Sequence, residues 1–220
     1  MFKRSNNKVT NYDEFGEEYM ITQNKYYSKR LDNSRKALYS QIDTPIKNKR
    51  LLDVGCGFGK DLSYFQKKGA IVYGIDISKK MIELAKRNNP NLTNISIQSF
   101  EKTNFEDCFF DIIVSRFTLH YATNLESVFK ELHRILKSKG ILIFLVSHPI
   151  LTFLNKKNKN YHKREIIQTQ LYDNKFTLKQ PTHTFSEYFN EFVLKNFKIL
   201  SFYEDTDNVP EFFISKLEKI

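Results

Sequence analysis

The chain has 220 residues, 40% of them hydrophobic, which is enough for one sizeable core and predicts a single domain with appendages. No apolar run approaches the roughly 18 residues of a membrane span. The first residues lack the apolar core of a signal peptide, so we expect a cytoplasmic protein. Two cysteines, Cys56 and Cys108, are too few for a disulfide framework and are expected to be reduced thiols.

The formal net charge of +10 suggests nucleic acid or an anionic surface as a partner. However, lysine outnumbers arginine 27 to 8, which is typical of solvated lysine faces. One dense basic cluster occurs, Lys156 to Arg164, in a segment without clear periodicity. The charge therefore says little about partners, and we do not predict nucleic-acid binding from it.

The N-terminal segment is polar over residues 1–10, which we expect to be disordered. From Asn11 to about Gln41, aromatic and aliphatic residues recur at loosely helical spacing. We predict one or two helices there, broken near Thr22–Asn24 and ended by the turn at Pro45. Residues 1–44 are thus predicted to form a helical lid.

Strands and helices then alternate. Predicted strands lie at 50–54, 71–75, 94–98, 110–115 and 141–147, and predicted helices at 60–68, 78–87 and 124–137. Gly140 is expected to mark the end of the last of these helices. This alternation predicts a parallel sheet with right-handed crossovers and helices on both faces.

The alternation of strands and helices ends after Ser147. Residues 148–183 have no clear periodicity and are predicted to be an irregular insertion over the functional edge of the sheet. Thr184 and Glu187 form a capping box for a helix to about Lys195. Two last strands, 197–203 and 212–217, are joined by only about eight residues, so they must pair antiparallel.

The stretch on which the chain is centred runs from Leu51 to Gly59, Leu-Leu-Asp-Val-Gly-Cys-Gly-Phe-Gly. An apolar strand opens into three glycines just before a helix, and this is where open α/β sheets bind their ligands. A dinucleotide fingerprint would need a third glycine where Lys60 stands. The pattern is Asp-x-Gly-x-Gly-x-Gly instead.

This motif resembles the first motif of the class I S-adenosylmethionine-dependent methyltransferases. With the strand pattern, the resemblance covers residues 50–218, and the segments 115–121 and 129–140 look like the methyltransferase domain 11 group, which acts mainly on small molecules. It implies a Rossmann-like, seven-stranded, mostly parallel sheet with an antiparallel C-terminal hairpin. The methyltransferase domain would span 45–220, with a cap insertion at about 148–183.

The resemblance also implies the cofactor, S-adenosyl-L-methionine, released as S-adenosyl-L-homocysteine. Asp53 and the glycine loop would hold its amino-acid part, Asp76 its ribose hydroxyls, and Ile77 with Met81 its adenine. Ser99 stands where the family has a carboxylate, so Phe100 carries more of the adenine contact. The complete set implied for the cofactor is Asp53, Gly55, Cys56, Gly57, Gly59, Asp76, Ile77, Met81, Ser99, Phe100, Ser115 and Tyr19.

Three residues are candidates for catalysis. His120 follows the fourth strand and is expected to face the methyl donor, whereas His148 follows the fifth strand and is expected at the rim of the same pocket. Either could act as a base near neutral pH, although His120 could equally contact the cofactor without proton transfer. Arg116 could hold an acceptor carboxylate or phosphate, or form a surface salt bridge.

We therefore predict methyl transfer to an oxygen, nitrogen or carbon atom of a small molecule. An RNA-modifying enzyme is one alternative, and it would need the Lys156–Arg164 cluster on the rim of the pocket. A protein that binds the cofactor without turnover is the other. No Cys/His pair has ligand spacing, so no metal site is predicted. The sequence leaves the oligomeric state open.

Overall fold

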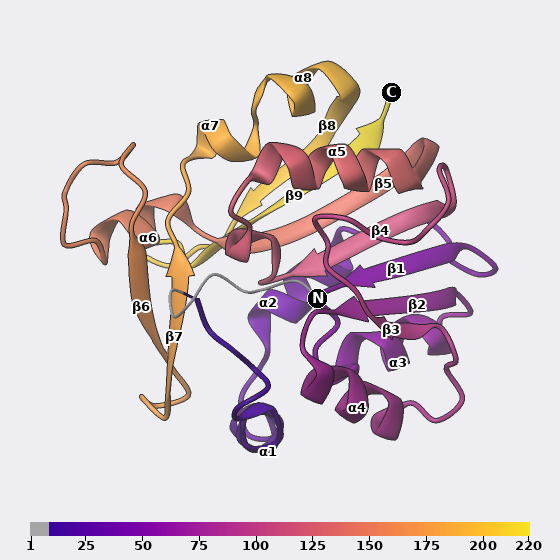
Figure 1. Cartoon of the computed structure of the whole chain (residues 1–220), viewed down its shortest axis with the longest axis horizontal. Coiled ribbons are helices and arrows are strands. Elements are labelled where there is room, and N and C mark those ends of the chain that lie inside the picture. Colours follow the sequence, from indigo (N-terminus) through magenta and orange to yellow (C-terminus); the bar gives the residue numbers. More distant parts are fainter. Residues whose placement is uncertain (1–8) are drawn as a thin grey trace.

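A seven-stranded sheet forms the centre of the computed structural model, which describes residues 9–220 (Figure 1). Its strand order is β3-β2-β1-β4-β5-β9-β8. The strands are β1 (Arg50–Val54), β2 (Ile71–Asp76), β3 (Ile95–Ile97), β4 (Phe110–Arg116), β5 (Leu136–Ser147), β8 (Phe197–Glu204) and β9 (Phe212–Lys219). Strands β1 to β5 run parallel, and β9 is antiparallel to both neighbours, β5 and β8. The predicted fold class is confirmed.

Helices cover both faces of this sheet (Figure 1). They are α1 (Gly16–Tyr27), α2 (Asn33–Ser40), α3 (Lys60–Lys67), α4 (Lys79–Asn88), α5 (Leu125–Ile135), α6 (Pro149–Leu154), α7 (Phe185–Tyr188) and α8 (Glu191–Asn196), with a 3₁₀ turn, η1, at Leu119–Tyr121. Helices α2, α3 and α4 share one buried core, and α5, α7 and α8 share the other. Among the described residues, no helix has the length and apolar character that a membrane span requires.

The local sequence explains why these elements form where they do. Strand β5 is apolar from Ile141 onward and almost fully buried there, as a strand covered on both faces must be. Helix α5 buries one stripe of five apolar side chains and starts at Asn124, whose side chain accepts a hydrogen bond from the Ser127 backbone N–H. Ser78 caps α4 in the same way: its side chain accepts a hydrogen bond from the Met81 backbone N–H.

The boundaries differ from the prediction around α5 and after it. Helix α5 ends at Ile135, and β5 begins at Leu136 rather than at 141. Leu136 already pairs with Phe110, and a register shift before the next pair absorbs the residues up to Gly140. The single helix predicted from Thr184 to Lys195 is two short helices, because Asn190 caps a new one. The capping box of Thr184 and Glu187 is confirmed.

The insertion at 148–183 is more regular than predicted. It contains α6 and a two-stranded antiparallel sheet, β6 (Ile166–Leu171) and β7 (Phe176–Pro181). The hairpin turn places three consecutive residues, Tyr172 to Asn174, at positive φ, which Asp and Asn tolerate better than most side chains. Asp173-Asn174 is therefore a turn signal in the sequence, although this segment is predicted to be irregular.

The N-terminal segment lies against this hairpin. Helix α1 runs unbroken through Thr22–Asn24, so the predicted break there is wrong, and the interruption falls after Tyr27. Thr10 exchanges backbone and side-chain hydrogen bonds with Lys179 of β7, so it is ordered, contrary to the prediction. The rest of the predicted disordered segment, residues 1–8, lies outside the described residues.

Candidate active site

The glycine loop follows β1 and leads into α3, at the carboxyl edge of the sheet. Its three glycines all have positive φ, but they are needed for different reasons. A Cβ on Gly55 would lie 2.1 Å from the Thr118 hydroxyl, and one on Gly59 would lie 2.4 Å from the Asn89 amide nitrogen. A Cβ on Gly57 would meet nothing within 4 Å. Gly55 and Gly59 therefore permit close packing, whereas Gly57 keeps space open.

This space belongs to a cavity of about 1440 Å³ at the carboxyl ends of the parallel strands. Its wall includes the glycine loop, the end of β2, helices α1 and α2, the hairpin β6–β7 and the loop between β8 and β9. Of the residues predicted from the sequence, the cavity is lined by Tyr19, Asp53, Gly55, Cys56, Gly57, Asp76, Ile77, Met81, Ser99, Phe100, Arg116 and His120.

Three predicted site residues do not line the cavity. Ser115 is fully buried and donates its hydroxyl hydrogen to the Val54 carbonyl, so it joins two strands. Gly59 packs against α4. His148 is also fully buried: its Nδ1 accepts a hydrogen bond from the Ile150 backbone N–H, and its Nε2 lies 2.6 Å from a Glu204 carboxylate oxygen. The expectation that His148 lies at the rim of the pocket is wrong, because the ring caps α6 instead.

Asp53 is almost completely buried, and one of its carboxylate oxygens has no hydrogen-bond partner among the described residues. Burial, reinforced by the nearby Asp61 carboxylate, raises the pKa of Asp53 well above its usual value. An unsatisfied buried carboxyl oxygen on a cavity wall is expensive unless a ligand meets it. Asp53 is therefore poised for a cationic or hydrogen-donating group.

Sequence reasoning missed the charged network beside Asp53. The Asp61 carboxylate accepts a hydrogen bond from Arg35 Nε at 2.5 Å and lies 3.5 Å from Arg116 Nε, and the Tyr39 hydroxyl also donates to it. Although burial opposes ionisation, Arg116 and Arg35 lower the pKa of Asp61 to about 2. Arg116 is thus paired inside the protein. No spacing in the sequence could reveal this, because the partners come from α2, α3 and β4.

Asp76 stands at the end of β2. One carboxylate oxygen accepts the Gly57 backbone N–H at 3.1 Å, and the other accepts the Ser78 N–H at 2.8 Å. Asp76 therefore ties the glycine loop to the start of α4 while lining the cavity. Beside it, Met81 is buried in the cavity wall, whereas Ile77 remains 46% exposed.

His120 lies on η1 and is only 4% exposed. Its Nδ1 accepts a hydrogen bond from the Ser147 backbone N–H at 3.3 Å, which places the proton of the neutral ring on Nε2. Burial, with a smaller effect from His183, lowers the pKa of His120 to about 3. A neutral ring with its proton on Nε2 is a hydrogen-bond donor through that nitrogen. This geometry does not support the predicted role of His120 as a base.

Two pairs of tyrosine hydroxyls join the N-terminal segment to other parts of the wall. The Tyr12 and Tyr121 hydroxyl oxygens lie 3.3 Å apart, and those of Tyr19 and Tyr172 lie 3.2 Å apart. Burial raises the pKa of Tyr12 well above its usual value. The N-terminal segment is therefore held to η1 and to the hairpin by neutral hydroxyl contacts.

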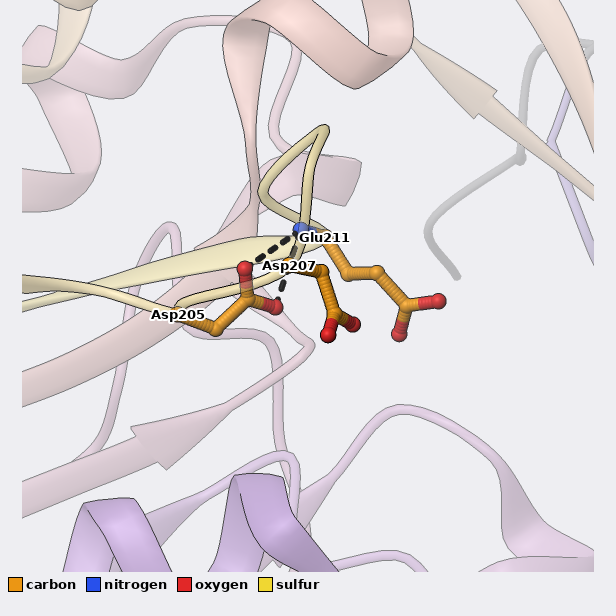
Figure 2. A group of neighbouring side chains, drawn as sticks. All are labelled: Asp205, Asp207 and Glu211. Atoms are coloured by element: carbon orange, nitrogen blue, oxygen red, sulfur yellow. Dashed lines mark hydrogen bonds between the residues drawn. The ribbon is translucent and has the colours of Figure 1, made fainter.

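The loop between β8 and β9 adds three acidic residues that the sequence analysis did not consider, Asp205, Asp207 and Glu211 (Figure 2). All three line the cavity, and one carboxylate oxygen from each lies within 4.8 Å of the others. Both carboxylate oxygens of Asp205 accept the Glu211 backbone N–H, at 3.0 and 2.9 Å. Cys/His spacing in the sequence gives no sign of these residues, because all three are acidic and lie in a strand connection.

Comparison of the chain with known protein families agrees with this fold and site. Residues 52–144, from β1 to β5, match the family model described as a methyltransferase domain. This part of the chain is therefore similar to a methyltransferase domain.

Curated relatives of this chain include a sterol 4-C-methyltransferase of Caenorhabditis elegans, 29% identical over 68% of this chain and 47% of that protein. A ubiquinone biosynthesis O-methyltransferase of Pelagibacter ubique is 34% identical over 54% of this chain and 48% of that protein. The chain therefore spans about half the length of the curated relatives it matches.

Solved structures share the fold. An S-adenosylmethionine-dependent methyltransferase from Mesorhizobium loti superposes with a TM-score of 0.69, covering 84% of this chain and 96% of that one at 23% identity. The complex of DhpI with S-adenosylhomocysteine superposes with a TM-score of 0.63, covering 94% and 93% at 16% identity.

Proposed function

We propose that this protein transfers the methyl group of S-adenosylmethionine to a small-molecule acceptor. The observation that carries the proposal is the single cavity that contains both the glycine-loop side and a second compartment. That second compartment is walled by His120, the hairpin β6–β7 and the β8–β9 loop. A donor and an acceptor could therefore meet in one cavity, which is what an alignment-driven transfer requires.

The residues on the glycine-loop side fit the cofactor. Gly57 leaves space for a close backbone approach, and the unsatisfied Asp53 oxygen could meet the ammonium group of its amino-acid part. Asp76 would take the ribose hydroxyls, Ile77, Met81 and Phe100 the adenine, and Cys56 and Gly55 the adjoining wall. The Ser99 hydroxyl already accepts the Glu101 N–H at 3.2 Å, so its contact with adenine would be weaker.

The cofactor supplies a methyl group on a sulfonium: a lone pair of the acceptor atom forms the new bond, the carbon–sulfur bond breaks toward sulfur, and any proton of the acceptor atom leaves to solvent. The chain contributes alignment and exclusion of water. His120 would orient the acceptor through Nε2–H, and Arg116 would keep Asp61 ionised beside the donor end rather than bind an acceptor anion.

Residues 9–44, the described part of the predicted 1–44 lid, would cover the cavity, and residues 148–183 would form a cap over it. In support, Tyr19 of α1 contacts Tyr172 of the hairpin, and Thr10 is paired with β7. The lid and the cap therefore meet above the cavity that both line. Both lie outside residues 52–144, the part that the family model matches, and they would select the acceptor.

Small molecules are favoured over RNA as acceptors by the basic cluster. Lys156 is buried, and its ammonium group donates to the carbonyls of Asn160 and Lys163. Arg164 is paired with Glu187, and none of the residues 156–164 lines the cavity. The relatives named for ubiquinone and sterol methylation point the same way. A cytoplasmic location belongs to the same proposal.

The test is incubation of the purified protein with methyl-labelled S-adenosylmethionine and a fractionated extract of the source cell. Label is expected in a small-molecule fraction and not in RNA, and Gly57→Val should abolish it. Label in RNA would establish the RNA-modifying alternative. Cofactor binding with no label in any fraction would establish a non-catalytic binding protein.

A further inference from the structure

We propose that Lys60 is the counter-ion of the cofactor's carboxylate group, at the place where the glycine loop meets helix α1. The Lys60 ammonium group lies 5.8 Å from the centre of the Tyr27 ring, and both residues line the cavity. This inference rests on the proposed function, because it adds a binding residue for the same S-adenosylmethionine.

The amino-acid part of S-adenosylmethionine carries two charged groups, an ammonium and a carboxylate. The unsatisfied oxygen of Asp53 suits the ammonium group, but the carboxylate has no partner so far. A carboxylate that leaves water for the wall of a cavity needs a cation or several hydrogen-bond donors in return. Asp53 and Asp76 on the same wall would repel it. The cavity therefore has to supply a positive charge close to the glycine loop.

Lys60 is the cation of the cavity wall that suits this task. The lysine and arginine side chains that line the cavity are Arg30, Arg35, Lys36, Lys60, Lys102 and Arg116. Each of the three arginines already contacts an aspartate. Lys36 and Lys102 are exposed to solvent. Lys60 is half-buried and, within residues 9–220, forms no ion pair with an acid.

The local structure fixes where Lys60 stands. It is the first residue of α3 and follows Gly59, whose left-handed backbone turns the chain from the glycine loop into the helix. Its backbone therefore adjoins the loop that would hold the amino-acid part of the cofactor. Its side chain extends to Tyr27, the last residue of α1. An anion bound by Lys60 would thus lie between the glycine loop and the lid.

The electrostatic surroundings of Lys60 favour an incoming anion. Burial lowers the pKa of its ammonium group, and the positive charge of Arg35 lowers it further. Asp32 and Asp61 oppose this effect without cancelling it. A carboxylate beside the ammonium group would favour the charged form and so offset both costs. The side chain is therefore better satisfied with an anion bound than without one.

A purely structural role for Lys60 is the competing explanation. An ammonium group 5.8 Å from the centre of a tyrosine ring is within the range of a cation–π contact, which would hold α1 against α3. In that case, removal of Lys60 would weaken every ligand that α1 covers. A counter-ion acts only on ligands that carry the carboxylate. Two ligands that differ in this group alone therefore separate the two explanations.

The experiment measures binding by isothermal titration calorimetry. The ligands are S-adenosylhomocysteine and decarboxylated S-adenosylhomocysteine, which keeps the ammonium group and lacks the carboxylate. The variant Lys60→Met removes the charge and keeps an unbranched side chain. It is expected to bind S-adenosylhomocysteine about tenfold more weakly than the wild type, because a hydrogen bond between charged groups is lost. Its affinity for the decarboxylated ligand should equal that of the wild type.

The matched control is Lys67→Met, the same substitution at the last residue of α3, where the side chain is exposed and not part of the cavity wall. It should bind both ligands as the wild type does. Lys60→Arg, which keeps the charge, should retain most of the preference for S-adenosylhomocysteine. The melting temperature of each unliganded variant checks the fold, and Lys60→Gln replaces Lys60→Met if the latter lowers it.

Two results would overturn this inference while leaving the proposed function intact. One is an unchanged affinity of the neutral variant for S-adenosylhomocysteine. The other is an equal loss of affinity for both ligands, since this would make Lys60 a structural contact of α1. Failure of the wild-type protein to bind either ligand would overturn the proposed function itself and this inference with it.

Discussion

At the scale of single residues, the site shows that one residue type can serve several physical purposes within one loop. Gly55 and Gly59 stand where a side chain would collide with the protein itself, so their replacement acts on the fold. Gly57 stands where a side chain would enter the cavity, so its replacement acts on the ligand. The motif in the sequence does not distinguish these roles, because spacing alone does not say what each Cβ would meet.

The first prediction uses this contrast. S-adenosylhomocysteine is expected to bind the wild-type protein at micromolar concentration and to raise its melting temperature. Gly57→Val should abolish that rise while the protein still folds, because the side chain fills ligand space. Gly59→Val is the control: it should lower the melting temperature itself, because it collides with Asn89. An unchanged ligand response in Gly57→Val would contradict the placement of the cofactor.

The second prediction concerns pH. The pKa of His120 is about 3 in the folded protein against 6.5 for a free histidine, so the unfolded chain binds the extra proton between these values. Stability is therefore complete above pH 6.5 and falls as the pH falls toward 3. From pH 6.5 to 5 the contribution of His120 should amount to about 2 kcal/mol. Urea unfolding of wild type and His120→Gln across this range measures it; identical pH slopes would show that His120 is not buried in its neutral form.

At the scale of elements, the sequence predicts the position of those helices and strands that a single local signal determines. The strands β1, β2 and β4, the capped helix α4 and the closing antiparallel strands each carry their own signal in periodicity, caps or loop length. The hairpin β6–β7 did not, because it is half exposed and short. His148 was misplaced because the residue after a strand faces the cavity only if the next helix does not use it as a cap.

The third prediction follows from that cap. His148→Ala should lower the free energy of unfolding by about 1–2 kcal/mol, because it removes the acceptor for the Ile150 N–H and leaves Glu204 without its partner. His148→Asn should recover part of this loss, since Asn is a good N-cap. Turnover, once an acceptor is known, should stay close to wild type in both variants. A large loss of turnover with unchanged stability would return His148 to the list of catalytic candidates.

The fourth prediction concerns α1 as a lid. Its contacts to the hairpin are tyrosine hydroxyls and ring edges more than buried aliphatic packing, so it should open more readily than the sheet. Amide hydrogen exchange over residues 16–27 should slow when S-adenosylhomocysteine is added, because both α1 and the ligand would line the cavity. Exchange in β4, in the sheet, serves as the internal control. Equal exchange in α1 with and without ligand would refute the lid.

At the scale of the whole molecule, the site is assembled from elements that are distant in sequence. The network of Arg35, Asp61 and Arg116 joins three elements. The acidic residues of the β8–β9 loop reach the cavity only because β9 inserts between β5 and β8. Most residues predicted on the glycine-loop side line the cavity, because they lie at or just after the carboxyl ends of parallel strands, where a sequence pattern can place them. The sequence could not predict the acceptor side, because that side exists only after the sheet, the cap and the C-terminal loop have come together.

The last prediction also belongs to the whole molecule and concerns its charge. If the net charge of +10 comes from solvated lysines, RNA should bind no more tightly than the non-specific range of about 10⁻⁴ to 10⁻⁶ M at physiological salt. Fluorescence anisotropy with labelled single-stranded and duplex RNA measures this.

The double variant Lys157→Glu/Lys163→Glu reverses two exposed charges of the basic cluster without touching the cavity. The variant should weaken the non-specific RNA binding slightly, because its net charge is lower. Methyl transfer to the small-molecule fraction should be unchanged. Nanomolar RNA binding that this variant abolishes, together with lost transfer, would identify the cluster as a substrate-binding surface and RNA as the acceptor.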